Sequence, residues 1–383
     1  MRRLIQGALL VVPALLLETS TFAATRGVQH YLYVANDDDA TIDVFDVDNG
    51  HQKVRSFDAS AGYSGKRRYR GITAHPGTAR LYVSDSDDGF VAAFDLLTDK
   101  LVWKKTFDEC TFPDRLNITK DGQTLYIPCK KDPMQHVAIN AETGEVIQTY
   151  PMDKYPHNSF TGESGKYMYM SAYRNDTLFI ADANTHELVK KVSGFTSGIR
   201  PFTVDKEERF FFATVTNILG FSVGDIENEK KLFDIKLETP KERTKNKKAG
   251  TELSHGGQPK SHGIAIRPGT REIWFNDDKW GYLYAYDTSP LYKKVPEAPV
   301  QVAMIPLFTD ITKKWTTTRW RWVNTNTDGR YIYPASGIVV DAETKKITDM
   351  KITPSEKLIG IDFSNGKPVA AGGQNGGYFP LQD

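Results

Sequence analysis

The chain has 383 residues, and its 49 basic side chains nearly balance 48 acidic ones. This balance gives no overall field that would favour nucleic acid or a membrane surface, so any electrostatic recognition must be local. The length exceeds the ~100 to 200 residues of a typical domain, but closed β architectures often run longer as one unit.

The first residues predict a secretory signal peptide. Arg2 and Arg3 form a charged start, an apolar run extends from Leu4 to Leu17, and small residues follow at Thr21 to Ala23. The apolar run falls short of the ~20 residues needed to span a bilayer, which disfavours the alternative of an uncleaved anchor. We therefore predict cleavage after Ala23, export to a periplasm or an equivalent lumen, and no integral membrane segment after cleavage.

One pattern then recurs along the whole chain. Each copy has a short strand centred on an aromatic residue, a polar turn, a second strand ending in Asp or a substitute, and a turn of the Thr-Gly type. Two clear copies are Leu32-Tyr33-Val34 with Val44-Phe45-Asp46, and Leu81-Tyr82-Val83 with Ala93-Phe94-Asp95. The central aromatics, called anchor aromatics below, are Tyr33, Tyr82, Tyr126, Tyr169, Phe211, Trp274 and Tyr333.

The spacing of the anchor aromatics predicts an all-β fold, a seven-bladed β-propeller of four-stranded antiparallel blades. The first intervals are 42 to 49 residues, a blade-like period, and the last two, of 63 and 59 residues, indicate insertions in surface loops. Each blade cannot bury its two apolar faces alone, so the blades stack around an axis. We predict a single domain over residues 24–383, closed by a blade that the segments Tyr31–Ala35 and Leu358–Phe363 share.

These repeats resemble the YVTN-type repeats of secreted bacterial seven-bladed propellers. The resemblance covers the mature chain end to end and concerns the Leu-Tyr-Val strand, the Val-Phe-Asp strand and the Thr-Gly turn. Such propellers serve as surface proteins, binding modules and noncatalytic subunits of periplasmic redox enzymes.

Within that group, this chain is similar to the family of hydrazine synthase β subunits in its size, its predicted export and its lack of a cofactor motif. The resemblance assigns no functional residue. It implies haem-bearing partner subunits in a hetero-oligomeric complex of anaerobic ammonium oxidation. The partners would carry c-type haem and make hydrazine from nitric oxide and ammonium, and the compartment would be the anammoxosome.

The two cysteines, Cys110 and Cys129, are spaced for neighbouring strands, and an exported chain meets an oxidising compartment. A structural disulfide is therefore the prediction. No Cys-x-x-Cys-His segment exists for covalent haem attachment, so any haem in the system would belong to a partner.

Basic residues recur where each innermost strand begins. When the blades are aligned on their turns, we expect these side chains to encircle one mouth of the central channel, where they could hold an anion, a haem propionate or a partner's carboxylate. The alternative is that they pair with blade acids such as Asp114 and Asp205. The ring consists of Arg70, Arg115, His157, Arg200, His262 and Arg321.

A metal site is a weaker hypothesis. His157, His262 and His255 could meet, but they lack a fixed short spacing and a carboxylate companion. The sequence assigns no metal ligand and no catalytic residue with its own motif.

Two segments are candidates for partner contacts. A basic loop carries Lys245, Lys247 and Lys248, which either serve solvation or dock on an acidic face. Further on, Trp and Arg alternate with strand period, so Trp320 and Trp322 should share a face as core residues of the last blade. Trp315 and Arg319 are the preferred contacts there, because Trp and Arg dominate interface hot spots.

Three functions remain open. The first is a noncatalytic subunit of an exported multihaem redox complex. The second is a free periplasmic or surface propeller that binds a small ligand or polymer. The third is an enzyme, such as a lyase or lactonase, that uses the His and Arg ring.

Overall fold

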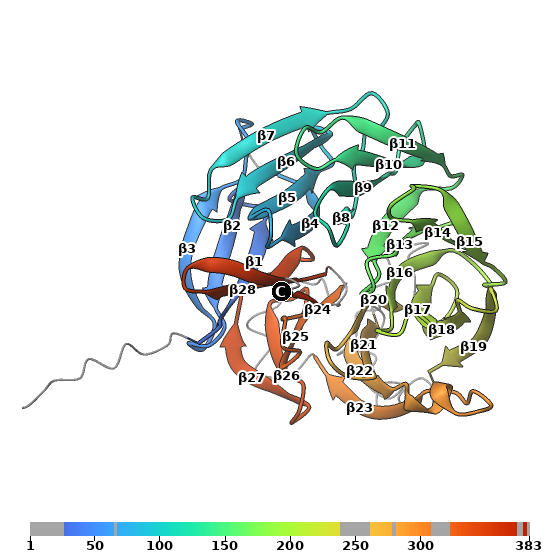
Figure 1. The fold of residues 1–383 in the computed structure, drawn as a ribbon. Helices are drawn as coiled ribbons and strands as arrows, with labels where there is room; N and C mark the ends of the chain where they lie inside the picture. The colour runs from blue at the N-terminus through green and yellow to red at the C-terminus, as the bar shows by residue number, and fades with distance from the viewer. Residues whose placement is uncertain are drawn as a thin grey trace, which may run out of the picture.

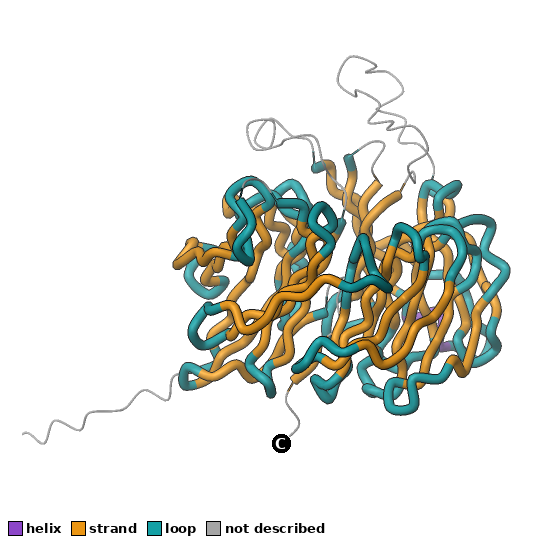
Figure 2. The backbone as a smooth tube through the Cα atoms, turned by 90° about the horizontal axis from the view of Figure 1, so that it is seen from above, coloured by secondary structure: helices purple, strands orange, loops and turns teal. Residues whose placement is uncertain are grey.

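A computed structural model describes residues 27–64, 67–237, 261–277, 281–307, 322–373 and 378–380. These residues form seven antiparallel sheets around an axis (Figure 1), which confirms the predicted seven-bladed β-propeller. Figure 2 shows the ring edge-on, with loops and turns gathered at its two faces. Within the described ranges no helix is long and apolar enough to cross a membrane. The predicted signal peptide lies outside them.

Six blades each take four consecutive strands, with the innermost strand first. Blades 2 to 4 consist of β4 (Tyr69–His75), β5 (Arg80–Asp85), β6 (Phe90–Asp95), β7 (Leu101–Thr106); β8 (Asn117–Ile118), β9 (Thr124–Cys129), β10 (Gln135–Asn140), β11 (Val146–Pro151); and β12 (Pro156–Thr161), β13 (Tyr167–Ala172), β14 (Leu178–Asp182), β15 (Leu188–Val192). Blades 5 to 7 consist of β16 (Ile199–Val204), β17 (Phe210–Val215), β18 (Gly220–Asp225), β19 (Lys230–Lys236); β20 (Ser261–Ile266), β21 (Glu272–Asp277), β22 (Tyr282–Asp287), β23 (Val300–Pro306); and β24 (Val323–Thr325), β25 (Tyr331–Pro334), β26 (Ile338–Asp341), β27 (Lys346–Lys351).

Blade 1 joins the two ends of the described chain. The C-terminal strand β28 (Leu358–Ser364) pairs with β1 (Gln29–Asn36), so that Leu32 lies opposite Gly360. This confirms that the two predicted segments share one blade. The sheet continues outward through β2 (Thr41–Asp46) and β3 (Gln52–Asp58), and on its other side through β29 (Lys367–Gly372) and β30 (Tyr378–Pro380).

The anchor aromatics form the core between blades. All seven are at most 1% exposed, and the two strands of each repeat pair as a hairpin, with Leu32 opposite Phe45 and Leu81 opposite Phe94. The aromatic positions recur because each sheet must present large apolar side chains to the neighbouring sheet.

The third turn of a blade reaches the anchor aromatic of the preceding blade. His51 Nε2 lies 2.8 Å from the Tyr333 hydroxyl, and His186 Nδ1 lies 2.8 Å from the Tyr126 hydroxyl. Both histidines adopt the left-handed backbone conformation, with φ of 60° and 61°. This turn geometry satisfies a buried hydroxyl and joins neighbouring blades.

The long anchor intervals leave the number of blades at seven. In blade 6 the connection from β22 to β23 contains a short 3₁₀ helix, η1 (Ser289–Tyr292), and the other added residues lie mainly between β19 and β20 and between β23 and β24. The interpretation as insertions rather than missed repeats is thus confirmed. Residues 238–260 and 308–321 lie outside the described ranges.

Candidate functional site

The predicted ring residues that fall within the described ranges lie at one face, where the innermost strands begin; we call it the starting face. Arg115 precedes β8, and Arg321 lies outside the described ranges. In four blades an irregularity in strand pairing, typical of a β-bulge, occurs at the ring residue. These four residues are Arg70, His157, Arg200 and His262. A bulge takes a side chain out of the regular alternation of a strand and can re-aim it toward a site.

Asp114 connects two cations of this face. Arg70 Nε donates to Asp114 Oδ1 at 3.0 Å, and Lys130 Nζ lies 3.5 Å from Asp114 Oδ2. The Asp114 side chain is 0% exposed, whereas Arg70 and Lys130 retain 13% and 18% exposure. Burial would raise the pKa of Asp114, but Arg70 and Lys130 hold it well below its usual value. The carboxylate is therefore ionised beneath its cations.

The backbone holds Asp114 and Lys130 side by side. The Asp114 amide donates to the Pro128 carbonyl at 2.8 Å, and the Lys130 amide donates to the Phe112 carbonyl at 3.0 Å. Between these contacts, a disulfide joins Cys110 to Cys129, with both cysteines fully buried. The crosslink thus fixes the segment that carries Asp114 against the end of β9.

A glycine permits the close approach of blades 2 and 3. A Cβ atom added to Gly71 would lie 2.7 Å from the Leu116 amide nitrogen and 2.9 Å from the Asp114 carbonyl oxygen. One residue earlier, the Arg70 carbonyl accepts a hydrogen bond from Arg115 Nη1 at 2.6 Å. Any larger residue at position 71 would separate the two arginines.

Arg115 lies deep in the site against an indole. Its guanidinium carbon is 3.3 Å from the centroid of the Trp322 ring, a cation–π contact, and Nη2 donates to Glu356 Oε2 at 3.1 Å. Its Nε is buried without a hydrogen-bond partner. Burial lowers the pKa of Arg115 to about 9, with Glu356 and Asp114 opposing the change, so the side chain stays charged at neutral pH.

Two ring histidines surround the same indole. The His157 ring is nearly parallel to that of Trp322, with centroids 5.8 Å apart, and His262 meets the indole edge-on at 5.1 Å. A Cβ atom on Gly263 would lie 2.4 Å from Trp322 Cα, so glycine is required beside His262. Burial holds the pKa of His157 well below its ordinary value, which keeps this imidazole neutral.

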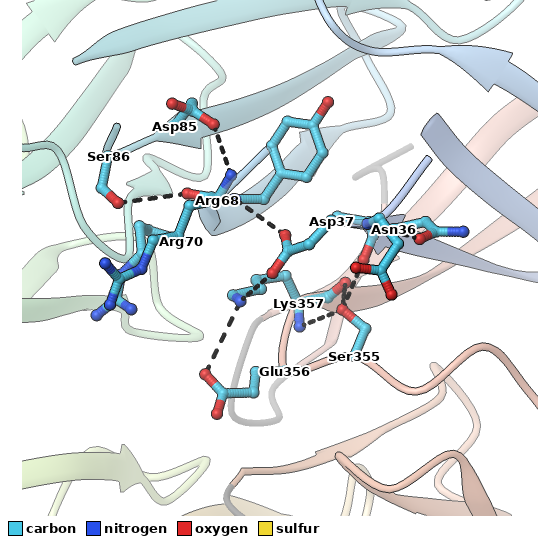
Figure 3. Close-up of polar contacts among 12 residues, drawn as sticks. Asn36, Asp37, Arg68, Arg70, Asp85, Ser86, Ser355, Glu356 and Lys357 are labelled. Carbon is cyan, nitrogen blue, oxygen red and sulfur yellow. Dashed lines mark hydrogen bonds and ion pairs between the residues drawn. The ribbon is translucent and has the colours of Figure 1, made fainter. Parts of the chain in front are cut away.

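Lys357, Asp37 and Glu356 form another set of charged side chains, at the point where β28 and β1 close the ring (Figure 3). Lys357 Nζ lies between two carboxylates, 3.4 Å from Asp37 Oδ2 and 3.9 Å from Glu356 Oε2. Asp37 also accepts a hydrogen bond from the Tyr69 amide at the start of β4. Burial lowers the pKa of Lys357. Blades 1 and 2 are thus joined by the residues that complete the site.

Tyr173 contacts both Lys130 and Arg200 and so links the two sides of the cluster. Lys130 Nζ and the Arg200 guanidinium lie 5.1 Å and 4.8 Å from the Tyr173 ring centroid. Arg200 Nε donates to His262 Nε2 at 3.2 Å. We name the whole group the axial cluster: Asp37, Arg70, Asp114, Arg115, Lys130, His157, Tyr173, Arg200, His262, Trp322, Glu356 and Lys357.

The arrangement does not resemble a metal centre. Because arginine can only donate, His262 Nε2 is the acceptor of the Arg200 hydrogen bond and its lone pair is already used. No group of three or more His, Cys, Asp or Glu side chains that could hold a metal occurs within the described ranges. His255 lies outside them.

The sequence located part of this cluster. Arg70 pairs with Asp114, as one alternative proposed, but Asp205 contacts the Tyr292 hydroxyl rather than a ring arginine. Sequence reasoning missed the roles of Lys130, Tyr173, Glu356 and Lys357, and it placed Trp322 only in the core of the last blade. The predicted partner contacts lie outside the described ranges: Lys245, Lys247, Lys248, Trp315 and Arg319.

The fold and the cluster together define a seven-bladed β-propeller with cations at one end of its axis. No protein-family model matches the sequence, and no curated protein matches it. Solved structures do match the fold. Hydrazine synthase from Kuenenia stuttgartiensis has a TM-score of 0.61 at 13% identity, with 84% of this chain and 92% of that chain covered.

Two further structures are similar. The dihydro-heme d1 dehydrogenase NirN, in complex with DHE, has a TM-score of 0.58 at 14% identity, covering 89% of this chain and 67% of that one. A protein of unknown function from Desulfotomaculum acetoxidans DSM 771 has a TM-score of 0.64 at 9% identity, covering 86% and 98%. At these identities the likeness establishes the fold.

Proposed function

We propose that this protein is a noncatalytic propeller subunit of an exported multihaem redox complex of the hydrazine synthase kind. In that role it positions partner subunits that carry c-type haem. The fold supports the proposal, because the hydrazine synthase chain is covered over 92% of its length. This likeness is one of fold, so the partner and the reaction are proposals for this chain.

The observation that carries the proposal is the construction of the axial cluster as a binding surface. Its cations are held by carboxylates and aromatic rings, with Arg70 on Asp114 and Arg115 on Trp322. Within the described ranges, His157 Nδ1 is buried without a hydrogen-bond partner, so this nitrogen has no hydroxyl or thiol to activate. The cluster is therefore suited to recognition.

A docking surface for such a partner lies beside the cluster, on the starting face. The exposed Arg174 lies over two tyrosine rings, 4.6 Å from the Tyr155 centroid and 5.5 Å from the Tyr173 centroid. Lys154 and Tyr155 have φ values of 73° and 67°, a strained conformation that recurs at functional sites. Tyr and Arg are also enriched among the residues that dominate interface energies.

The test is affinity purification of a tagged chain from its own source, followed by an absorption spectrum and subunit analysis. We expect a stable complex with c-type haem bands. A colourless monomer would refute the proposal.

A pair of charge reversals localises the interface in the same experiment. Arg174→Glu changes the proposed docking surface, so we expect less haem protein to copurify. Lys166→Glu is the matched control, because Lys166 is also exposed and lies over an aromatic ring, that of Tyr167, but on the opposite face. Equal yields of haem protein with both variants would show that the partner does not dock on the starting face at Arg174.

The cationic cluster also favours a second candidate, a free propeller that binds a small anionic ligand. The same purification separates the two functions, since this candidate gives a monomer with a bound small molecule.

A further inference from the structure

Around Asp114 the accessible charge of the axial cluster is positive, whereas at the other end of the cluster Asp37 and Glu356 themselves reach solvent, with 29% and 15% exposure. Asp114 is fully buried, while Arg70 and Lys130, which hold it, reach solvent. One carboxylate thus serves two cations at this point. An anion approaching the starting face meets the ammonium and guanidinium groups before it meets Asp114.

The deeper part of the cluster contains polar atoms without partners. Arg115 is 2% exposed and its Nε–H has no acceptor, and His157 is 1% exposed with Nδ1 likewise without a partner. A buried donor without an acceptor costs about 1 to 3 kcal/mol, and most buried polar groups in proteins are satisfied. Unsatisfied nitrogens beside several cations are typical of a site that is completed by a ligand.

The internal ion pairs indicate the chemistry of that ligand. Asp114 lies between Arg70 and Lys130, and Glu356 lies between Arg115 and Lys357, so each carboxylate is held by one guanidinium and one ammonium group. Planar guanidinium groups match carboxylates through parallel hydrogen bonds. A further carboxylate would meet the same donors.

We propose that the axial cluster is a carboxylate-binding site, in which Arg70 and Lys130 bind an incoming carboxylate at the starting face. The carboxylate belongs either to a free organic acid or to an Asp or Glu side chain of a docked protein. This inference concerns the cluster alone and does not depend on haem-bearing partners.

Binding at this site should take up a proton in mildly alkaline solution. Burial lowers the pKa of Lys130 to about 8; Asp114 opposes the change, and Arg70, Arg200 and Arg115 add to it. Tyr173 is the remaining ring that faces the ammonium group. A bound carboxylate favours the charged form of Lys130 and so raises its pKa, which couples binding to protonation above pH 8.

The experiment is calorimetric titration of the purified, oxidised mature chain. One arm uses succinate, with the neutral isostere succinamide as control, and a second arm uses a short glutamate-rich peptide. We expect at least one carboxylate probe to bind, succinamide not to bind, and binding to weaken with added salt. At pH 8.5, the heats measured in buffers of different ionisation enthalpy should show proton uptake.

A variant separates binding from folding. Lys130→Met should weaken the affinity for the carboxylate probe at least about tenfold and abolish the proton uptake, because it removes a charged donor. Lys100→Met removes an equal charge from an exposed turn of blade 2 and should bind like the wild type.

Succinate binding identifies a free acid as the source, and binding of the peptide alone identifies a protein side chain. If neither probe binds, or if Lys130→Met binds like Lys100→Met, the proposal is wrong.

Discussion

Replacing Lys130 with Met should stabilise the protein while it weakens the proposed site. The pKa of Lys130 falls from 10.5 to about 8, and one pKa unit is equivalent to about 1.4 kcal/mol, so the charged form is disfavoured by about 3 kcal/mol in the fold. Methionine keeps the apolar stem without the charge. Allowing up to about 1 kcal/mol for the lost contact with the Tyr173 ring, we expect a gain of about 2 kcal/mol at pH 7.

The gain should depend on pH in a defined direction. Lys130 has a lower pKa in the folded protein than in the unfolded chain, so between pH 8 and 10.5 the unfolded chain binds more protons. The stability of the wild type therefore rises with pH across this window, and the advantage of Lys130→Met shrinks. Below pH 8 the advantage is complete.

Urea unfolding of both proteins at pH 7 and pH 9.5 measures this difference, with Lys100→Met as the control. Lys100 is exposed in a turn, so its substitution should change the free energy of unfolding by less than about 0.5 kcal/mol. A Lys130→Met variant that is less stable than the wild type at pH 7, or whose advantage is independent of pH, would refute the assigned burial of this charge.

Three further changes test other parts of the structure. Replacing Cys110 and Cys129 with serine opens a loop with a sequence separation of 19, and urea unfolding should show a loss of about 3 kcal/mol; an unchanged midpoint would contradict a structural disulfide. Gly71→Ala places a Cβ atom against the Asp114–Leu116 segment, so it should lower the free energy of unfolding by about 1 to 3 kcal/mol and weaken carboxylate binding. Calorimetry that shows unchanged binding would mean that blade 2 shifts freely and that this close approach is not required. Burial lowers the pKa of His51 to about 4, so stability present above pH 6.5 should fall as the pH drops toward 4, and His51→Asn should reduce this dependence in pH-dependent unfolding; an unchanged slope would contradict the buried contact with Tyr333.

The fold could be predicted because the residues that determine it, the anchor aromatics, recur at a regular interval in the sequence. An aromatic such as Tyr82 must recur once per blade to fill the space between sheets, and the polar turns that follow separate the strands. Ring closure could be predicted as well, since the strand around Leu32 and the one around Gly360 would otherwise remain exposed edges.

The site was predicted only in part, because its connections join distant positions. Arg115 contacts Glu356 across 241 residues, and no local pattern marks that pairing. Lys130 lies directly after a strand in an ordinary basic dipeptide, and its contacts with Asp114 and Tyr173, which distinguish it from Lys131, appear only in the fold. The bulges that place His157 out of register are backbone features without a side-chain signature.

The last strand of the ring also sets an order of events during synthesis. Because β28 supplies the strand that pairs with β1, the first strand of the propeller lacks this neighbour until the chain has been made as far as Ser364. Glu356 and Lys357 directly precede β28, so the same late segment delivers two charges of the axial cluster. A chain interrupted before this point would lack both the strand that closes the ring and two of the charges of the axial cluster.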